Sequence, residues 1–172
     1  MNMDNESREV QVVAFRLENA EYGIEIGQVR EIINLSEITP LPQANQTIEG
    51  VINLRGEIIP IINLKKRLNL ANDTYPSEAR VIVVESEKQL LGLKVDEAVE
   101  VLHLNKEAVQ TLGDIFPQAE KRNLIVGVGK LEDRLIVLLD LARVLDHQEI
   151  QEIQKDIEEA QAQAVGAGKS EK

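Results

Sequence analysis

Residues 48–64 constrain the fold of this chain most strongly, because two short apolar runs there flank a charged turn. The runs Ile48–Leu54 and Ile58–Leu64 are rich in β-branched residues, and Arg55-Gly56-Glu57 lies between them. Short apolar runs separated by a glycine-containing turn predict a β-hairpin whose strands are largely buried. The sequence therefore predicts a rigid hairpin that presents Arg55 and Glu57 at its tip.

This hairpin is repeated later in the chain, in residues 125–141. The positions of the first copy that are identical in the second include Ile48, Gly50, Val51, Leu54 and Leu64. Segments 12–33 and 81–102 precede the two hairpins and also match, at the glycines Gly23 and Gly92 and the glutamates Glu31 and Glu100. Identity at glycines and apolar positions is typical of a shared backbone, so an internal duplication is predicted. Chance similarity between β-rich segments is the alternative.

The expected fold class is all-β, with two small barrels that arise from this duplication. Each copy contains several short strands joined by turns, and closed barrels avoid exposed sheet edges. Helical patterns are confined to short pieces and to the C-terminal tail, residues 148–172. The apolar residues of this tail recur at helical spacing on one face, at Ile150, Ile153, Ile157, Ala160 and Ala164. We expect a weakly packed terminal helix, or less readily a partner-binding helix, followed by disorder beyond Val165.

Composition excludes several classes of function. The net charge of −11 disfavours binding to nucleic acid or to anionic lipid, and the chain has few aromatic residues for stacking on bases. It has no cysteine, and its two histidines lack metal-ligand spacing, so no metal site or cofactor is expected. No catalytic constellation can be assembled, and the basic run Lys65-Lys66-Arg67 is expected to be solvated or to meet an acidic partner. The protein is expected to be soluble and cytoplasmic, with contact as its function.

Several short strings carry a family resemblance. In the first half they are Phe15-x-Leu17, Tyr22-Gly23-Ile24, Val29-x-Glu31-Ile32, Ile38-Thr39-Pro40-Leu41-Pro42, and Gly50-Val51-Ile52-Asn53-Leu54-Arg55-Gly56 with Ile59-Pro60. In the second half they are Val95-Asp96, Val99-x-Val101, Gly127 and Leu138-Leu139-Asp140-Leu141. From about Val10 to Leu145 the chain resembles the CheW family of bacterial chemotaxis coupling proteins.

This resemblance implies two five-stranded SH3-like barrels with partly exchanged strands, and no catalytic activity. One CheW-like domain would span residues 10–147, with subdomain 1 at about 15–80 and subdomain 2 at about 81–145, the latter possibly completed by the strand 10–14. Its partners would be the regulatory domain of the histidine kinase CheA and the cytoplasmic hairpin tip of chemoreceptors. The protein would be recruited to membrane-associated receptor arrays.

The resemblance also points to site residues. The candidates for an apolar receptor-binding groove are Val29, Glu31, Ile32, Val99 and Val101, and those for kinase or partner contact are Leu54, Arg55, Gly56 and Glu57. Ordinary core packing is the alternative for the aliphatic residues, and a local salt bridge is the alternative for Glu31 and Arg55. A small-molecule-binding β-barrel, or a CheW-like module of another signalling system, is the alternative function.

Overall fold

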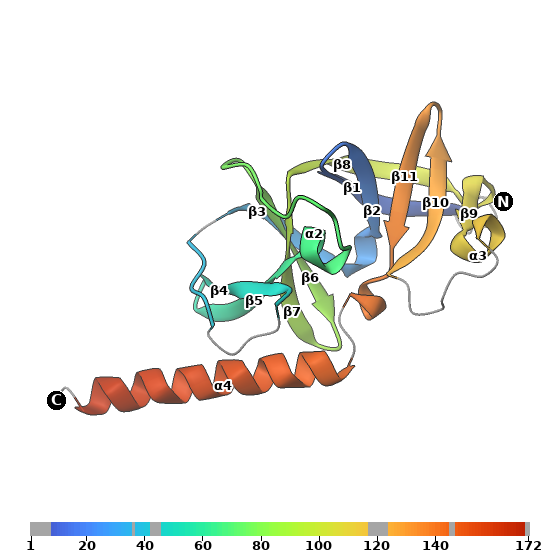
Figure 1. Ribbon diagram of the computed structural model, residues 1–172. Coiled ribbons are helices and arrows are strands. Elements are labelled where there is room, and N and C mark those ends of the chain that lie inside the picture. The colour runs from blue at the N-terminus through green and yellow to red at the C-terminus, as the bar shows by residue number, and fades with distance from the viewer. Residues whose placement is uncertain (1–7, 36, 42–45, 117–123, 145–146, 171–172) are drawn as a thin grey trace.

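Two β-sheets make up most of the molecule (Figure 1). The computed structural model describes residues 8–35, 37–41, 46–116, 124–144 and 147–170. The six-stranded sheet has the order β8 (Glu97–Asn105), β1 (Glu9–Leu17), β2 (Ala20–Glu25), β11 (Arg134–Leu139), β10 (Ile125–Leu131) and β9 (Val109–Thr111). The five-stranded sheet has the order β3 (Val29–Asn34), β6 (Arg80–Ser86), β7 (Gln89–Val95), β5 (Glu57–Asn63) and β4 (Ile48–Leu54). The expected all-β class with SH3-like halves is confirmed.

Helical elements connect or flank the strands. The short ones are η1 (Ile26–Gln28), α2 (Leu64–Arg67), η2 (Lys106–Ala108), α3 (Leu112–Ile115) and η3 (Leu141–Arg143). The long helix α4 (His147–Ser170) runs beside the β6–β7 end of the five-stranded sheet, and its C-terminal part extends beyond both sheets (Figure 1).

The two sheets are built alike, which confirms the predicted duplication. Under the sequence repeat, strands β1, β2, β10 and β11 correspond to β6, β7, β4 and β5. Corresponding strands pair in the same register: Gly23 lies opposite Leu138 in a parallel pair, and Gly92 lies opposite Ile61 in the corresponding parallel pair. The short strand β9 is a difference, because its counterpart in the five-stranded sheet is a single bridge between Thr39 and Val51.

The hairpins β1–β2 and β6–β7 are exchanged between the two copies. The hairpin β1–β2 pairs with β8 and β11 of the second copy, while β6–β7 pairs with β3 and β5 of the first. The sheets therefore do not follow the expected subdomain boundaries 15–80 and 81–145, because the whole segment 9–25 joins the second half and the segment 80–95 joins the first. The reason is that the chain crosses from one sheet to the other immediately after each of these hairpins.

Two equivalent glycines allow a neighbouring chain to pass close to the sheet. Gly50 has φ +150°, and a Cβ there would overlap the carbonyl oxygen of Thr39. Gly127 holds the same position in the second copy, where a Cβ would clash with the carbonyl oxygen of Gln110. This close approach explains why both copies of the repeat have glycine here. Any side chain would force Thr39 away from β4 or Gln110 away from β10.

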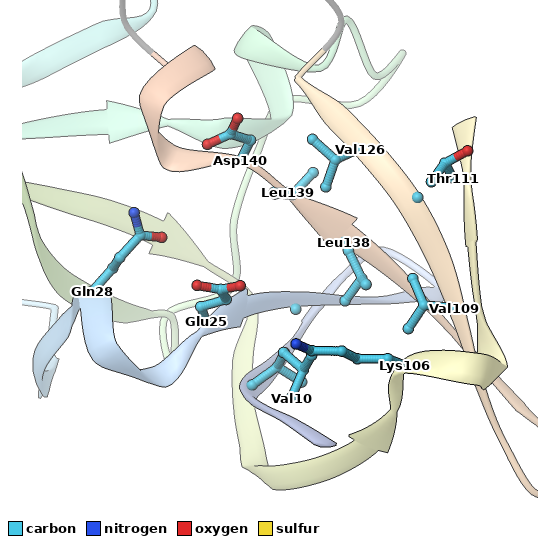
Figure 2. Close-up of a pocket in the computed structure, with 13 residues that line it drawn as sticks. Val10, Glu25, Gln28, Lys106, Val109, Thr111, Val126, Leu138, Leu139 and Asp140 are labelled. Carbon is cyan, nitrogen blue, oxygen red and sulfur yellow. The ribbon is translucent and has the colours of Figure 1, made fainter. Parts of the chain in front are cut away.

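The six-stranded sheet borders an open cavity. Its volume is about 500 Å³, and it lies between the corner at η1 and the strands β9, β10 and β11 (Figure 2).

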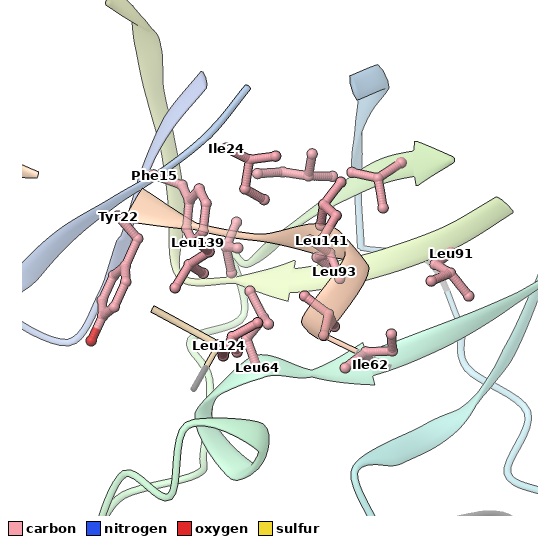
Figure 3. Close-up of a cluster of buried hydrophobic side chains, with 14 of the residues drawn as sticks. Phe15, Tyr22, Ile24, Ile62, Leu64, Leu91, Leu93, Leu124, Leu139 and Leu141 are labelled. Carbon is pink, nitrogen blue, oxygen red and sulfur yellow. The ribbon is translucent and has the colours of Figure 1, made fainter. Parts of the chain in front are cut away.

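One hydrophobic core is shared by both sheets and by α4 (Figure 3). Phe15 and Tyr22 of the six-stranded sheet stack with ring centroids 6.0 Å apart, and Ile62 and Leu93 enter from the five-stranded sheet. A smaller apolar cluster lies on each sheet separately. Because the largest cluster spans both halves, the two halves are held together by the hydrophobic effect rather than by a linker alone.

Helix α4 packs more firmly than expected. Ile150, Ile153 and Ile157 are all buried in the shared core, which confirms the predicted apolar face for these three residues. The side chains of Ala160 and Ala164 lie outside the described part of the chain. The helix continues to Ser170, past Val165, where disorder was expected to begin. The segment is rich in Ala, Gln and Glu and contains no proline to end the helix.

Candidate protein-interaction surface

The turn between β4 and β5 is the predicted hairpin tip, and it holds Arg55 in an exposed position. Arg55 and Gly56 both have positive φ, at 52° and 88°. The Asn53 side-chain oxygen accepts a hydrogen bond from the Gly56 backbone N–H at 2.9 Å. Left-handed backbone at a non-glycine residue is unfavourable, so the flanking strands hold this turn in place. The Arg55 side chain remains 71% exposed.

Arg55 forms an ion pair with Glu31. Its guanidinium nitrogen Nη2 donates to Glu31 Oε1, so the turn at one side of the five-stranded sheet reaches strand β3 at the other. The structure thus brings together one residue expected in the receptor groove and one expected in the kinase contact. An exposed ion pair of this kind contributes only about 0.2–1 kcal/mol to stability.

The same arrangement recurs in the second copy with a different arginine. Glu100 corresponds to Glu31, and Arg134 Nη1 donates to Glu100 Oε1 at 3.0 Å. Arg134 Nε also donates to Glu21 Oε2 at 3.0 Å. The hydrogen bond from Arg134 holds the pKa of the Glu21 carboxyl below its usual value. Sequence comparison missed this pair, because Arg134 stands two positions after the residue that aligns with Arg55.

The remaining residues of the predicted kinase contact surround Arg55. Leu54 packs partly buried against the apolar cluster of the five-stranded sheet, which anchors the turn. Gly56 and Glu57 are exposed, and no atom of the described part of the chain lies within 4 Å of where a Gly56 Cβ would be. Leu54 is therefore an anchor, whereas Arg55, Gly56 and Glu57 are open to a partner.

The aliphatic residues of the predicted groove divide into exposed and packed positions. Ile32 is 44% exposed and Val101 is 48% exposed, at corresponding positions of β3 and β8. Val29 is half-buried and packs against the shared core. The Val99 side chain lies outside the described part of the chain. Strands β3 and β8 are outer strands of different sheets and do not pair with each other, so a single groove that contains both stays a prediction.

Lys65 is not the surface cation that the sequence suggested. It is 2% exposed, and its Nζ lies 2.8 Å from Glu18 Oε1 and 2.8 Å from Asp96 Oδ1. The Thr74 carbonyl oxygen accepts a further hydrogen bond from Nζ at 2.7 Å. Burial by itself lowers the pKa of Lys65, but the bonds to Asp96 and Glu18 outweigh burial and raise it. Lys65 therefore joins three chain segments instead of offering charge to a partner.

Among the residues that the structure describes, no group of histidines and carboxylates could hold a metal ion. The described helices likewise include none that is long and apolar enough to cross a membrane.

Duplicated sheets that share one core, and that display charged and apolar side chains on outer strands and turns, define a protein-interaction scaffold. Residues 11–149 match the family model of the CheW-like domain. The chain belongs to the CheW family, whose members are non-catalytic coupling scaffolds of chemotaxis.

Individual relatives agree with this assignment. Chemotaxis protein CheW of Thermotoga maritima is 30% identical over 147 residues, which cover 84% of this chain and 93% of the relative. Chemotaxis protein CheW of Rhizobium meliloti is 32% identical over 148 residues, covering 86% of this chain and 94% of the relative. The crystal structure of scaffolding protein TtCheW from Thermoanaerobacter tengcongensis superposes with a TM-score of 0.72 at 32% identity, covering 80% of this chain and 92% of that one.

Proposed function

We propose that this chain couples the cytoplasmic hairpin tips of chemoreceptors to the regulatory domain of the CheA histidine kinase. The observation that carries the proposal is the exposed ion pair between Arg55 and Glu31. Glu31 belongs to the strand proposed for the receptor, and Arg55 belongs to the turn proposed for the kinase. A change at either surface would therefore act directly on the other.

The kinase contact would centre on the Arg55 turn. Arginine offers five donors in a planar fork and is favoured where a partner presents carboxylates. Because the pair with Glu31 adds little stability, a partner carboxylate can compete for Arg55 at small energetic cost. Gly56 and Glu57 would provide accessory contacts around this anchor.

The receptor contact would use the outer strands β3 and β8. Single exposed aliphatic residues are common on protein surfaces, but Ile32 and Val101 are exposed at the same position of both copies. An amphipathic helical hairpin could lay apolar side chains on these residues, with Val29 and Val99 extending the contact. Glu31 would lie at the polar rim beside Ile32.

Coupling would follow from simultaneous contact with both partners. A scaffold that binds two partners can only shift the kinase between states if its contacts differ in the two states. The shared core keeps the two sheets in a fixed relation, so a small movement of the receptor tip would be passed on to the kinase. The chain would act in the cytoplasm, and receptor contact would recruit it to membrane-associated arrays.

Co-sedimentation tests this function. Wild-type chain is expected to pellet with receptor signalling fragments and CheA and to raise kinase activity. Arg55→Ala should reduce both, whereas Arg80→Ala, which removes another exposed arginine of the same sheet, should behave as wild type. If the wild-type chain fails to pellet, the proposed partners are wrong and a module of another signalling system becomes the better interpretation.

A further inference from the structure

In the first copy of the repeat, Tyr75 fills a space beside Asn63, Lys65 and Lys94. It belongs to the loop between α2 and β6, and its hydroxyl donates to Asn63 Oδ1 at 2.9 Å. The ammonium groups of Lys65 and Lys94 lie 4.4 and 4.5 Å from the centroid of its ring. This phenol therefore sits between a polar anchor and two cations, an arrangement that stabilises the aromatic ring electrostatically.

An ion pair closes the same gap. Glu49 of β4 and Lys94 of β7 lie on its two sides, and Lys94 Nζ is 2.9 Å from Glu49 Oε2. Asn63 Nδ2 also donates to Glu49 Oε1 at 2.9 Å. In the first copy the space is thus occupied by side chains of this chain.

The second copy has the same backbone but different side chains at this place. The counterparts of Asn63, Glu49 and Lys94 are, in that order, Asp140, Val126 and Glu25. No ion pair can form between Val126 and Glu25, and the counterpart of Lys65 is Ala142. Among the described residues no aromatic side chain lines the space, and the cavity of about 500 Å³ remains open there (Figure 2).

The cavity combines an apolar floor with an acidic rim. Val126, Leu138 and Leu139 belong to strands β10 and β11, and Figure 2 shows Asp140, just before η3, and Glu25, at the η1 corner, along one side of them. Lys106 approaches from η2 on the opposite side.

In the first copy Lys65 and Lys94 are the cations around the phenol. In the second copy the two corresponding positions hold Ala142 and Glu25. Lys106 is the one cation among the residues that line the cavity, against the carboxylates of Glu25 and Asp140. Asp140 also accepts a hydrogen bond from the Ala142 N–H at 3.0 Å and lies 3.4 Å from Arg143 Nε. The lining residues thus keep one more negative than positive charge, which an occupant with a cation of its own would balance at Glu25.

We propose that this cavity receives the tyrosine side chain of a partner protein, carried beside a lysine or arginine. The ring would lie on Val126 and Leu139, the phenol would donate to the Asp140 carboxylate as Tyr75 does to Asn63, and the neighbouring cation would face Glu25. The volume is within the range of clefts that bind small ligands, so it admits a phenol with its flanking chain. The inference does not depend on the partners proposed above.

Phenolic probes test the site on the full chain. Tyramine combines a phenol with an ammonium group, and 3-(4-hydroxyphenyl)propionate is its acidic analogue. In NMR titrations tyramine should produce saturable shifts, with a dissociation constant in the millimolar range expected for its size. Nuclear Overhauser effects should connect its ring to the methyl groups of Val126, Leu138 and Leu139. Binding of the acidic analogue should be about threefold weaker, because Glu25 is a partly solvated charge.

Two variants and a control separate the contributions. Val126→Phe should place a ring where the phenol would lie and abolish tyramine binding, while Glu25→Gln should retain binding and lose the preference for tyramine over the acid. Glu132→Gln makes the same change of net charge at the β10–β11 turn and should leave both affinities unchanged. The Glu25→Gln comparison stands even if Val126→Phe does not fold.

Three results would overturn the proposal. The first is the absence of saturable shifts up to the solubility of tyramine. The second is equal binding of the two probes by the wild-type chain. The third is a set of nuclear Overhauser effects from residues 1–7 to the cavity methyl groups, which would identify this chain's own N-terminal segment as the occupant.

Discussion

The guanidinium of Arg55 pairs with the carboxylate of Glu31, although β4 and β3 are the two outer strands of the five-stranded sheet. The pair therefore bridges the opening of that sheet at its surface. In the six-stranded sheet Arg134 bridges β11 to Glu100 of β8, again reaching an outer strand. The repeat thus retains a guanidinium–carboxylate contact even though the arginine comes from a different position of the turn.

The Arg55–Glu31 pair should matter more for binding than for stability. In a double-mutant cycle with Arg55→Ala and Glu31→Ala, the coupling free energy of unfolding should be no more than about 1 kcal/mol, because both groups are partly solvated. Urea denaturation of the four proteins measures it. A coupling well above that value, with unchanged partner binding, would show that the pair is a structural brace.

Removal of the Lys65 ammonium should destabilise the fold strongly. Lys65→Met leaves Asp96 and Glu18 without their cation, and breaking a buried ion pair in this way costs about 3–5 kcal/mol. Denaturant unfolding measures the loss. Lys66→Met, one residue later and exposed, should change stability by less than about 0.5 kcal/mol. Equal effects of the two substitutions would contradict the assigned role of Lys65.

The contact between Arg134 and Glu21 should make stability depend on pH. The hydrogen bond from Arg134 lowers the pKa of Glu21 from its usual 4.5. A lowered pKa in the folded state gives stability that is present above pH 4.5 and is lost as the pH falls through the folded-state value. The difference in unfolding free energy between wild type and Arg134→Gln should therefore shrink below pH 4.5. Lys130→Gln, an exposed neighbour on β10, is the control, and a difference that stays constant with pH would argue against the mechanism.

Gly50 and Gly127 should not tolerate a methyl group. Gly50→Ala would push Thr39 and strand β4 apart, with a loss of at least about 2 kcal/mol, and Gly127→Ala should act similarly at Gln110. At Gly27 no atom of the described residues lies within 4 Å of the added Cβ, so Gly27→Ala should stay within about 1 kcal/mol of wild type. Thermal unfolding of the three variants checks this order.

Helix α4 should contribute to the stability of the CheW-like domain. Ile153 is buried in the shared core, so Ile153→Ala should cost about 2–4 kcal/mol by leaving a cavity. Glu152→Ala on the exposed side of the helix is the control and should have a small effect. If both substitutions are neutral in denaturant unfolding, α4 packs as weakly as the sequence suggested.

Local patterns predicted the hairpins but not their assignment to sheets. Short apolar runs around the turn at Gly56 define the β4–β5 hairpin, and the repeat of the apolar runs predicted its counterpart β10–β11. The parallel pairs β2–β11 and β5–β7 join segments far apart in the chain, and no local pattern specifies them. The expected subdomain boundaries, drawn along the chain, therefore separate most of each exchanged hairpin from the sheet that it joins.

The burial of polar residues could not be predicted from the sequence either. Lys65 lies in a basic run that is typical of a solvated surface, and only the tertiary approach of Glu18 and Asp96 explains its burial. By contrast, Ile32 and Arg55 could be proposed as site residues from strand and turn patterns together with the family resemblance. The structure places both at the surface, and their roles in partner contact stay predictions.

Amide chemical-shift mapping of the full chain tests the coupling proposal most directly. A receptor hairpin fragment should shift the amides of β3 and β8 around Ile32 and Val101, and the CheA regulatory domain should shift those of Leu54–Glu57. Arg55→Ala should weaken the kinase titration by at least about tenfold, as for an arginine anchor worth more than about 1.4 kcal/mol. Saturable binding of both partners that leaves these two regions unshifted would contradict the account.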